Sequence, residues 1–294
     1  MNKNWKKLLA AFLLSTMIFS LSACKKDRNP VGDENGEGEQ SGGSGIVGSV
    51  SYSDMVKKIE DAKKENEFVK AWMTIPGTNI DLPIVYNPNE DNDYYLFKDL
   101  AGNETGSNGQ SWEDTVVYAD FRTQFDPQML FSSNNFVLYG HNWNNIRQPL
   151  VIGDDPDYTM FGQLPSYTDQ KFFEQHPYIY FSTEDNEMVW KIYAAFYCEQ
   201  DWTPEVGFNY NDPNLTPQQM STLLIEQSER NQFVTDVNVN ANDKILTLST
   251  CSRVIEGAGD EQRFVVVARL LREGESDKDP IVVYENEKPK APVL

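Results

Sequence analysis

The chain has 294 residues, of which 39% are hydrophobic and 12% aromatic, so it can bury a core and wholesale disorder is excluded. Its 45 acidic and 25 basic residues give a formal net charge of −20, which argues against nucleic-acid binding and against a basic patch for anionic lipid. Three cysteines and two histidines are too few for a disulfide framework or a Cys/His zinc site.

The first 24 residues have the pattern of a secretory signal. Lys3, Lys6 and Lys7 precede an uncharged apolar run over residues 8–23, which is shorter than the about 20 residues that a spanning helix needs. The run ends in Leu-Ser-Ala before Cys24 and resembles a bacterial lipobox, in which the cysteine is lipidated and becomes the new N-terminus. We therefore predict a lipid tether at Cys24, with an uncleaved membrane anchor as the alternative.

The next segment, residues 25–50, is rich in glycine, serine and acidic residues and has almost nothing to bury. That composition is typical of a flexible linker. We interpret residues 51–294 as one folded domain. Without the three signal lysines, the remainder of the chain from residue 25 carries a net charge of −23.

Helical and strand patterns follow in this domain. Ser51 and Asp54 have capping-box spacing before apolar residues at helical intervals, which predicts a helix from residue 51 to about residue 70. Thr216 and Pro217 predict the start of a second helix. Strand-like runs occupy residues 71–75, 80–85, 115–118, 136–139, 178–182, 188–199, 244–251, 263–271 and 281–284.

The run at residues 188–199 alternates apolar and polar side chains, which predicts a half-buried strand with Ile192, Ala194, Phe196 and Cys198 on its buried face. Many short strands separated by Gly, Pro and Asn turns indicate a mostly antiparallel β-barrel or sandwich with peripheral helices.

Three side chains with suitable chemistry stand at the ends of predicted strands. Cys251 ends the apolar run KILTLSTC before a glycine-rich loop, where a half-exposed thiol is well placed to react. Arg263 begins RFVVVARL, so pairing of these two strands would return it to the side of Cys251. His141 follows the strand in FVLYGHNW, where Gly140 lets the backbone turn.

A thiol, an imidazole and a guanidinium can perform acyl transfer, in which the thiolate attacks a carbonyl and the cation holds the oxyanion. With ordinary pKa values, only about 1% of molecules at neutral pH hold thiolate and imidazolium together. Either the site stabilises this ion pair or a small fraction acts. The alternative for Cys251 is a buried structural residue or a disulfide partner of Cys198.

Other candidates favour structural interpretations. Cys198 lies on the apolar face of its strand, and His176 precedes a proline after a predicted helix. The acidic runs at residues 90–93 and 154–157 lack the spacing of a dedicated calcium loop, so we interpret them as solvated turns.

The chain contains YGHN, then TLSTC, and then RFVVVARL, whose arginine comes twelve residues after the cysteine of TLSTC. This set of motifs resembles the class B sortases. AWMTIPGTNIDLPIV, DNDYYL, MFGQL and QKFFEQHPYIYF are similar to class B segments in the same order, over about residues 52–285. The resemblance implies an eight-stranded β-barrel with an N-terminal helical extension. It also implies a helix in the connection between the sixth and seventh strands, here residues 200–243.

The resemblance further implies transpeptidation. Cys251 would attack the Thr carbonyl of an Asn-Pro-x-Thr-x sorting motif in a surface protein, and an amine of peptidoglycan or its lipid-linked precursor would resolve the thioacyl-enzyme. His141 would act as general acid and then base, and Arg263 would stabilise the oxyanion. By position, Asn92, Leu96, Tyr139 and Ser249 would line the substrate groove, although each could equally serve the core or a turn. No cofactor or metal is expected.

Two features differ from the usual class B pattern: the lipobox in place of an uncleaved N-terminal helix, and Ser252-Arg253 where many members carry an acid after the nucleophile. Three alternatives stay open: a pilus-polymerising sortase with a pilin lysine as acceptor, a non-catalytic peptide-binding lipoprotein, and a plain cysteine peptidase. The lipobox and the sorting chemistry together predict a domain outside the membrane of a Gram-positive bacterium.

Overall fold

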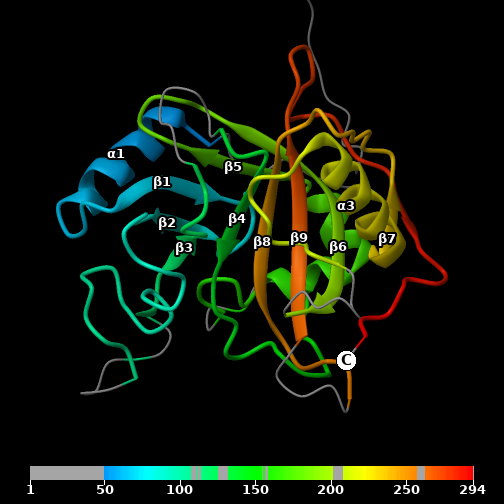
Figure 1. The fold of residues 1–294 in the computed structure, drawn as a ribbon, viewed down its shortest axis with the longest axis horizontal. Helices are drawn as coiled ribbons and strands as arrows, with labels where there is room; N and C mark the ends of the chain where they lie inside the picture. Colours follow the sequence, from blue (N-terminus) through cyan, green and yellow to red (C-terminus); the bar gives the residue numbers. More distant parts are fainter. Residues whose placement is uncertain are drawn as a thin grey trace, which may run out of the picture. The chain divides into compact units, whose positions relative to one another are not determined.

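Strands of the described residues close into an eight-stranded barrel in the order β1-β2-β3-β4-β8-β9-β6-β5 (Figure 1). Their bounds are β1 Val69–Thr74, β2 Asp81–Val85, β3 Val117–Ala119, β4 Asn135–Tyr139, β5 Tyr178–Ser182, β6 Val189–Glu199, β8 Ile245–Ser252 and β9 Gln262–Leu270. The pairs β2–β3 and β4–β8 are parallel and the others antiparallel. The predicted, mostly antiparallel barrel is therefore confirmed.

The structure is a computed structural model that describes residues 50–106, 111, 114–124, 132–153, 155, 158–200, 208–256 and 262–293. By contacts the chain divides into Met1–Gly45 and Ile46–Leu294, and the described residues belong to the second unit. The predicted signal segment, Cys24 and the linker up to residue 49 lie outside them. No helix within the described ranges is long and apolar enough to cross a membrane.

Strand β6 differs from its predicted half-buried form. The expected inward residues are buried, but Tyr193 and Glu199 on the opposite face are also only 6% and 5% exposed. The helix α3, Pro217–Arg230, covers this second face, and the Tyr193 hydroxyl donates to Gln227 Oε1 over 2.6 Å. A register shift between Ile192 and Ala194 also interrupts the alternation.

The helix α1, Tyr52–Lys63, ends before the predicted limit near residue 70, because β1 already begins at Val69. The predicted capping box is wrong, since the Ser51 side chain makes no cap hydrogen bond. The helix α3 does begin as predicted at Thr216, which forms a capping box with Gln219. It lies in the connection between the sixth and seventh barrel strands, β6 and β8.

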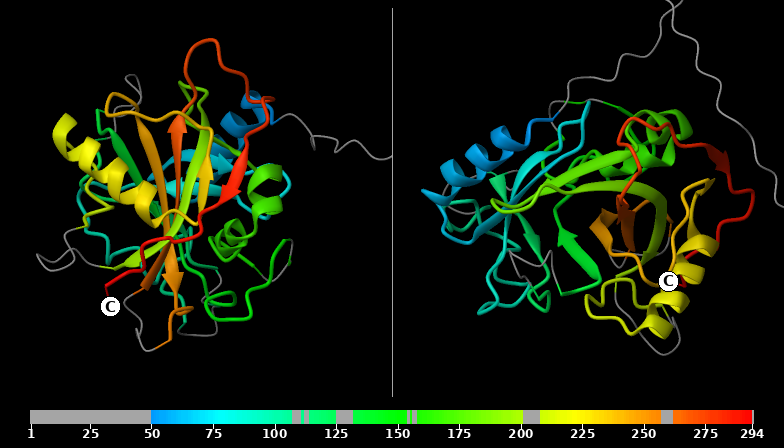
Figure 2. Two further views of the ribbon diagram at one scale, coloured as in Figure 1. Left: turned by 90° about the vertical axis from the view of Figure 1, so that its right-hand side faces the viewer. Right: turned by 90° about the horizontal axis from the view of Figure 1, so that it is seen from above.

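The remaining elements lie around the barrel (Figure 2). A short 3-10 helix, Leu164–Thr168, leads into α2, Gln170–Gln175. The strand β7, Phe233–Thr235, was not predicted from the sequence, and it pairs with β10, Val283–Glu285, in a separate sheet. The predicted strand at residues 281–284 is therefore real but shifted, and it does not join the barrel.

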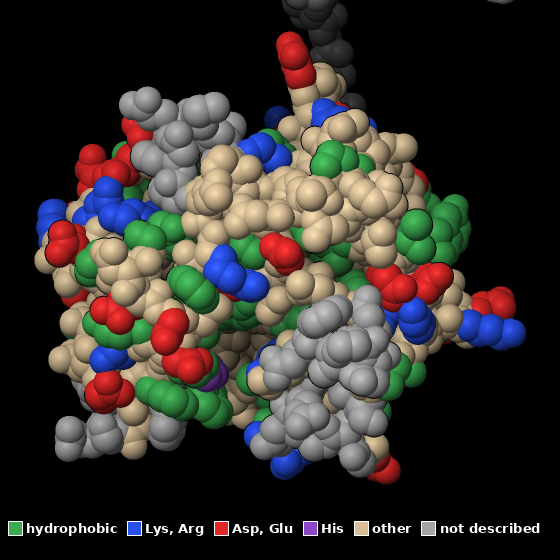
Figure 3. Space-filling view, in the orientation of Figure 1, with side chains coloured by type: hydrophobic (Ala, Val, Ile, Leu, Met, Phe, Trp, Pro, Cys, Tyr) green, Lys and Arg blue, Asp and Glu red, His purple; other side chains and the backbone are tan. Residues whose placement is uncertain are grey.

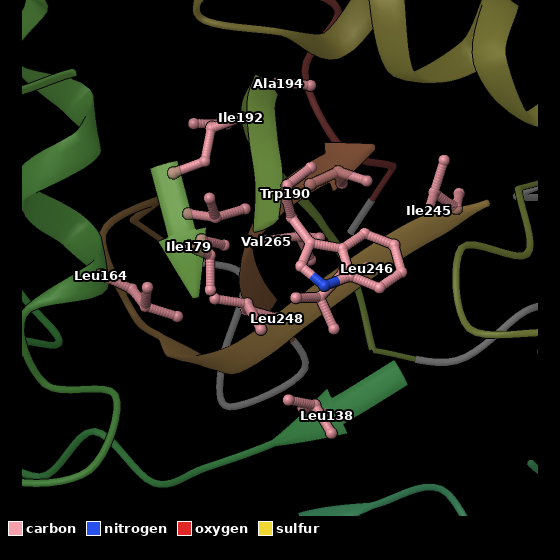
Figure 4. Close-up of a cluster of buried hydrophobic side chains, with 14 of the residues drawn as sticks. Leu138, Leu164, Ile179, Trp190, Ile192, Ala194, Ile245, Leu246, Leu248 and Val265 are labelled. Carbon is pink, nitrogen blue, oxygen red and sulfur yellow. The ribbon is translucent and has the colours of Figure 1, made fainter. Parts of the chain in front are cut away.

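Apolar side chains from facing strands fill the barrel (Figure 4). Trp190 is 1% exposed and lies among fully buried residues of β8 and β9, such as Leu246, Leu248 and Val265. Full burial of one such aliphatic side chain stabilises the fold by about 1.5–3 kcal/mol. The bodies of β8 and β9 are therefore held firmly, and their ends present the candidate site residues.

Candidate active site

Strand pairing brings Cys251 and Arg263 together. Cys251 is the penultimate residue of β8 and Arg263 the second of β9, and their Cα atoms are register partners. Directly opposite residues of an antiparallel pair point to the same face, so the thiol and the guanidinium share one side of the sheet. The strand pairing predicted from the sequence is confirmed.

His141 arrives from the parallel neighbour of β8. Tyr139 at the end of β4 is the register partner of Ser249, and the Gly140 amide donates to the Ser249 carbonyl over 3.2 Å. Two residues after this pair on each strand are His141 and Cys251. The parallel pairing therefore sets the imidazole beside the strand end that carries the thiol.

Gly140 serves a purpose other than the predicted backbone turn, since its φ is not in the left-handed region. A Cβ at this position would lie 2.8 Å from the ring of Phe161 and 3.0 Å from Val117. The Phe161 amide in turn donates to the His141 carbonyl over 3.1 Å. Glycine is thus required for close packing of the segment that leads into His141.

A small pocket of about 70 Å³ lies where these strand ends meet. Its lining residues are Leu96, Tyr118, Tyr139, Gly140, His141, Ser249, Thr250, Cys251 and Arg263. The face drawn in Figure 3 is hollowed between hydrophobic, acidic and basic side chains. His141, Cys251 and Arg263, selected from the sequence as the three catalytic candidates, therefore line one pocket.

The imidazole of His141 is only 9% exposed and is held by a backbone carbonyl. Its Nε2 lies 2.6 Å from the Leu96 oxygen, and because a carbonyl only accepts, Nε2 donates. The rings of Phe97 and Trp143 stack with it at centroid distances of 6.4 and 4.5 Å. Burial lowers the pKa of His141, the Arg263 charge adds to this, and the Leu96 carbonyl opposes it. The neutral imidazole is thus favoured at neutral pH.

The guanidinium of Arg263 is held by two hydrogen bonds. Its Nη1 donates to its neighbour's carbonyl, Gln262 O, over 2.8 Å, and its Nη2 donates to Gln200 Oε1 at the end of β6. The carbonyl of Cys251 accepts from Asn142 Nδ2 over 3.3 Å. The backbone around the half-buried thiol is therefore tied to the loop that follows His141.

Arg263 has a register partner on each neighbouring strand: Cys251 on β8 and Cys198 on β6. Cys198 is fully buried, and burial raises the pKa of its thiol well above the ordinary value. Because β9 separates β6 from β8, the Cα atoms of Cys198 and Cys251 are about two strand spacings, roughly 9.5 Å, apart. A disulfide needs Cα atoms within about 7 Å, and both thiols are free. Cys198 is a core residue, as predicted.

The four predicted groove residues divide into two groups. Leu96, Tyr139 and Ser249 line the pocket, although Ser249 is 2% exposed and its hydroxyl is 3.0 Å from that of Tyr210. Asn92 does not line it. The amide of Asn92 donates to Asp120 Oδ2 over 3.1 Å and accepts from the Phe121 amide over 3.1 Å.

Asp120 forms the buried support behind the pocket. The Tyr139 hydroxyl donates to its Oδ2 over 2.9 Å, and the Arg122 guanidinium binds both carboxylate oxygens. Burial acts to raise the pKa of Asp120, but the hydrogen bonds and charge of Arg122 outweigh it and hold the pKa below its usual range. Asn92 and Tyr139 are thus tied to one ionised, buried carboxylate.

Several residues of the site were not found from the sequence. Tyr118 and Thr250 line the pocket, Gln200 binds Arg263, and Trp143 stacks with His141. Thr250 lies within TLSTC and Trp143 directly follows YGHN, so both could have been included on that ground. Tyr118 lies in β3 and Gln200 directly follows β6, and only the barrel order brings them near.

The remaining candidates have structural surroundings. His176 caps the C-terminus of α2, and its Nδ1 lies 2.8 Å from the Pro76 oxygen, as the structural interpretation predicts. In the run at residues 90–93, Asp91 accepts from the Asp93 amide within a turn. Among the described residues no group of three His, Cys, Asp or Glu is placed to hold a metal, and residues 154, 156 and 157 fall outside them.

The family model described as Sortase domain matches residues 73–271, which include the strand ends of the site. The chain belongs to the sortase family. Sortases are transpeptidases that act on surface proteins with sorting signals and on cell-wall amines.

Curated relatives are class B members, which assigns this sortase to class B. Sortase B of Staphylococcus aureus (strain NCTC 8325 / PS 47) is 27% identical over 218 residues, which cover 73% of this chain and 75% of the relative. Sortase B of Listeria monocytogenes serovar 1/2a (strain ATCC BAA-679 / EGD-e) is 27% identical over 215 residues, or 73% and 74% of the two chains. Both source organisms are Gram-positive bacteria.

Solved structures agree with this assignment. The Staphylococcus aureus sortase B-substrate complex matches with a TM-score of 0.56 and 25% identity, over 75% of this chain and 87% of that chain. The Clostridium perfringens sortase B structure matches with a TM-score of 0.56 and 25% identity, over 72% and 99% of the two chains. The barrel and the class B resemblance are thereby confirmed together.

Proposed function

We propose that this sortase cleaves an Asn-Pro-x-Thr-x sorting motif of surface proteins after the threonine and transfers the acyl group to a peptidoglycan amine. One observation carries the proposal. Cys251, His141 and Arg263, from three neighbouring strand ends, line the same pocket. A nucleophile, a proton carrier and a fixed cation are the groups that acyl transfer through a thioester requires.

The surroundings of His141 suggest how protons move. Since Nε2 donates to Leu96, the lone pair of the neutral ring is on Nδ1, which accepts the Cys251 proton. The thiolate attacks the threonine carbonyl, and Arg263 stabilises the oxyanion. The imidazolium protonates the departing amine, leaving a thioacyl-enzyme. The incoming amine then attacks this thioester, gives its proton to His141, and releases Cys251.

The lowered pKa of His141 bears on the resting state that the sequence left open. Burial works against an imidazolium, so the neutral imidazole is favoured before substrate binds. This supports the alternative in which only a small fraction of molecules holds the thiolate–imidazolium pair at a given time.

The size of the pocket supports substrate binding across the surface. Sites that enclose a small-molecule ligand have volumes of about 300–1,000 Å³, whereas this pocket has about 70 Å³. It therefore admits the scissile carbonyl and a small side chain rather than a whole motif. The other residues of the sorting motif would lie along the hollowed face outside it.

We further propose that the domain works outside the cytoplasmic membrane of a Gram-positive bacterium. The proposal rests on the signal-like residues 1–24, with a lipid tether at Cys24, and on the linker-like residues 25–50. The alternative tether is the uncleaved apolar segment. Metabolic labelling with a fatty-acid analogue, compared between the wild type and Cys24→Ser, distinguishes the two.

The reaction is tested with the full chain and a library of Asn-Pro-x-Thr-x peptides, with and without amine acceptors that include a lysine side chain. Intact-protein and product mass spectrometry are the readouts. We expect a mass addition on Cys251 that an amine converts into a ligated peptide, and no addition on Cys251→Ala. Cys198→Ala is the matched control and should retain the addition, because Cys198 is fully buried away from the pocket.

Two outcomes would overturn the proposal. A folded protein with a free Cys251 thiol and no adduct for any motif would indicate a peptide-binding protein. An adduct that releases only to water, whatever amine is offered, would indicate a cysteine peptidase.

A further inference from the structure

The residue that directly follows β6 binds Arg263. The Gln200 Oε1 accepts from Arg263 Nη2. The strand register helps to explain this contact, because Cys198 is the partner of Arg263 and Gln200 comes two residues later, directly after the last residue of β6. A long side chain at that position can reach the diagonal neighbour on β9. The hydrogen bond therefore places the Gln200 amide beside the guanidinium that lines the same pocket as Cys251.

The backbone just before Gln200 is fixed by buried contacts. Glu199 is 5% exposed, and its carboxylate accepts from the Val293 amide of the C-terminal segment and lies 3.8 Å from Arg230 Nη2 of α3. Arg230 is fully buried and is centred 4.2 Å above the ring of Phe208. The base from which the Gln200 side chain extends is therefore attached to α3 and to the C-terminal segment.

The chemistry of an amide suits this position. A neutral carbonyl oxygen takes one guanidinium hydrogen and fixes the plane of the group, but it adds no negative charge. A carboxylate would pair with Arg263 and weaken the field at the pocket. Gln200 and the Gln262 carbonyl thus hold the orientation of Arg263 without adding any negative charge of their own.

We propose that Gln200 is a positioning residue that holds the Arg263 guanidinium in the orientation needed to stabilise the oxyanion formed at Cys251. The inference rests on the proposed function, since it assumes that the pocket carries acyl transfer. It assigns a role to the end of β6 that neither the sequence motifs nor the recognised triad contain.

The first test replaces Gln200 with methionine, which has similar length but no strong acceptor. We expect Gln200→Met to lower kcat of the full chain towards an Asn-Pro-x-Thr-x peptide by about tenfold, with KM changed by less than about twofold. The matched control is Gln218→Met on the exposed side of α3, which should act as the wild type. Thermal unfolding of all three proteins shows whether the fold is retained.

A double-mutant cycle separates positioning from simple structural support. Arg263→Lys keeps a positive charge but has no planar fork to orient. If Gln200 acts through Arg263, Gln200→Met should lower kcat by less than about twofold in the Arg263→Lys background. An equal loss in both backgrounds would overturn the proposal.

A second assay needs no sorting peptide, so its result does not depend on whether the proposed Asn-Pro-x-Thr-x motif is correct. The rate at which iodoacetamide alkylates Cys251, followed by peptide mass spectrometry across pH, should fall in Gln200→Met and not in Gln218→Met. If wild-type Cys251 forms no acyl adduct, the proposed function fails. If it forms the adduct and Gln200→Met matches the wild type in both assays, only the positioning role fails.

Discussion

The imidazole of His141 is fixed by the carbonyl of Leu96, which belongs to a turn segment rather than to a barrel strand. Second partners of this kind decide which ring nitrogen carries the proton. The main-chain position of Leu96 matters here as much as its side chain. A residue chosen from the sequence as a groove wall therefore also sets the tautomer of the proposed base.

The burial of His141 predicts the acidic limb of the pH profile. Because burial lowers its pKa, the ring becomes protonated only at a pH below the ordinary histidine value of about 6.5. Below that pKa it cannot accept the Cys251 proton, so kcat/KM should fall with a midpoint below about 6.5. NMR titration of His141, assigned with the His176→Asn variant, should give the same midpoint. A limb at or above 6.5 would contradict this interpretation.

At the scale of elements, local patterns predicted most strands but not how they are covered. The alternation in β6 identified the inward face, yet only the folded chain places α3 over the other face, against Tyr193. β7 was missed because three residues carry too little pattern to recognise. The helix α1 was predicted too long for a different reason, because no strong stop signal precedes β1.

The same distinction applies to the site. Cys251, Arg263 and His141 were found because strong motifs mark them at strand ends, and the β8–β9 pairing follows from adjacency in the chain. Gln200 and Tyr118 are about 50 and 130 residues away from Cys251 in sequence. Contacts over such separations depend on long-range strand pairing, and no local pattern predicts them. Asn92 was placed in the groove by resemblance, but its amide is used by Asp120 and Phe121.

The β4 end provides a test of how an element positions the site. Gly140→Ala would place a methyl group 2.8 Å from the fully buried ring of Phe161. The backbone amide of Phe161 donates to the His141 carbonyl. We expect a loss of about 1–3 kcal/mol in the free energy of unfolding, since overpacking forces neighbours to move. Chemical denaturation measures the loss, and kcat should fall as His141 shifts. An unchanged stability would show that Phe161 yields freely.

At the scale of the whole molecule, the net charge of −20 should affect which peptides arrive quickly. A field of one sign attracts oppositely charged ligands, and salt screens it over about 10 Å at 0.1 M ionic strength. For peptides with the same motif, kcat/KM should be higher with lysine flanks than with glutamate flanks at low salt. The difference should shrink as salt is added. Equal values at low salt would show that charge at the hollowed face is balanced locally.

The order of strands has a consequence for the survival of the thiol at the proposed location outside the membrane. In oxidising surroundings two cysteines within reach readily form a disulfide, and a disulfide would inactivate a catalytic thiol. In this barrel β9 lies between the strands of Cys251 and Cys198 and keeps the two thiols apart. A disulfide of Cys251 therefore has to form with a thiol other than Cys198, and an external reducing thiol can reverse it at the half-exposed end of β8.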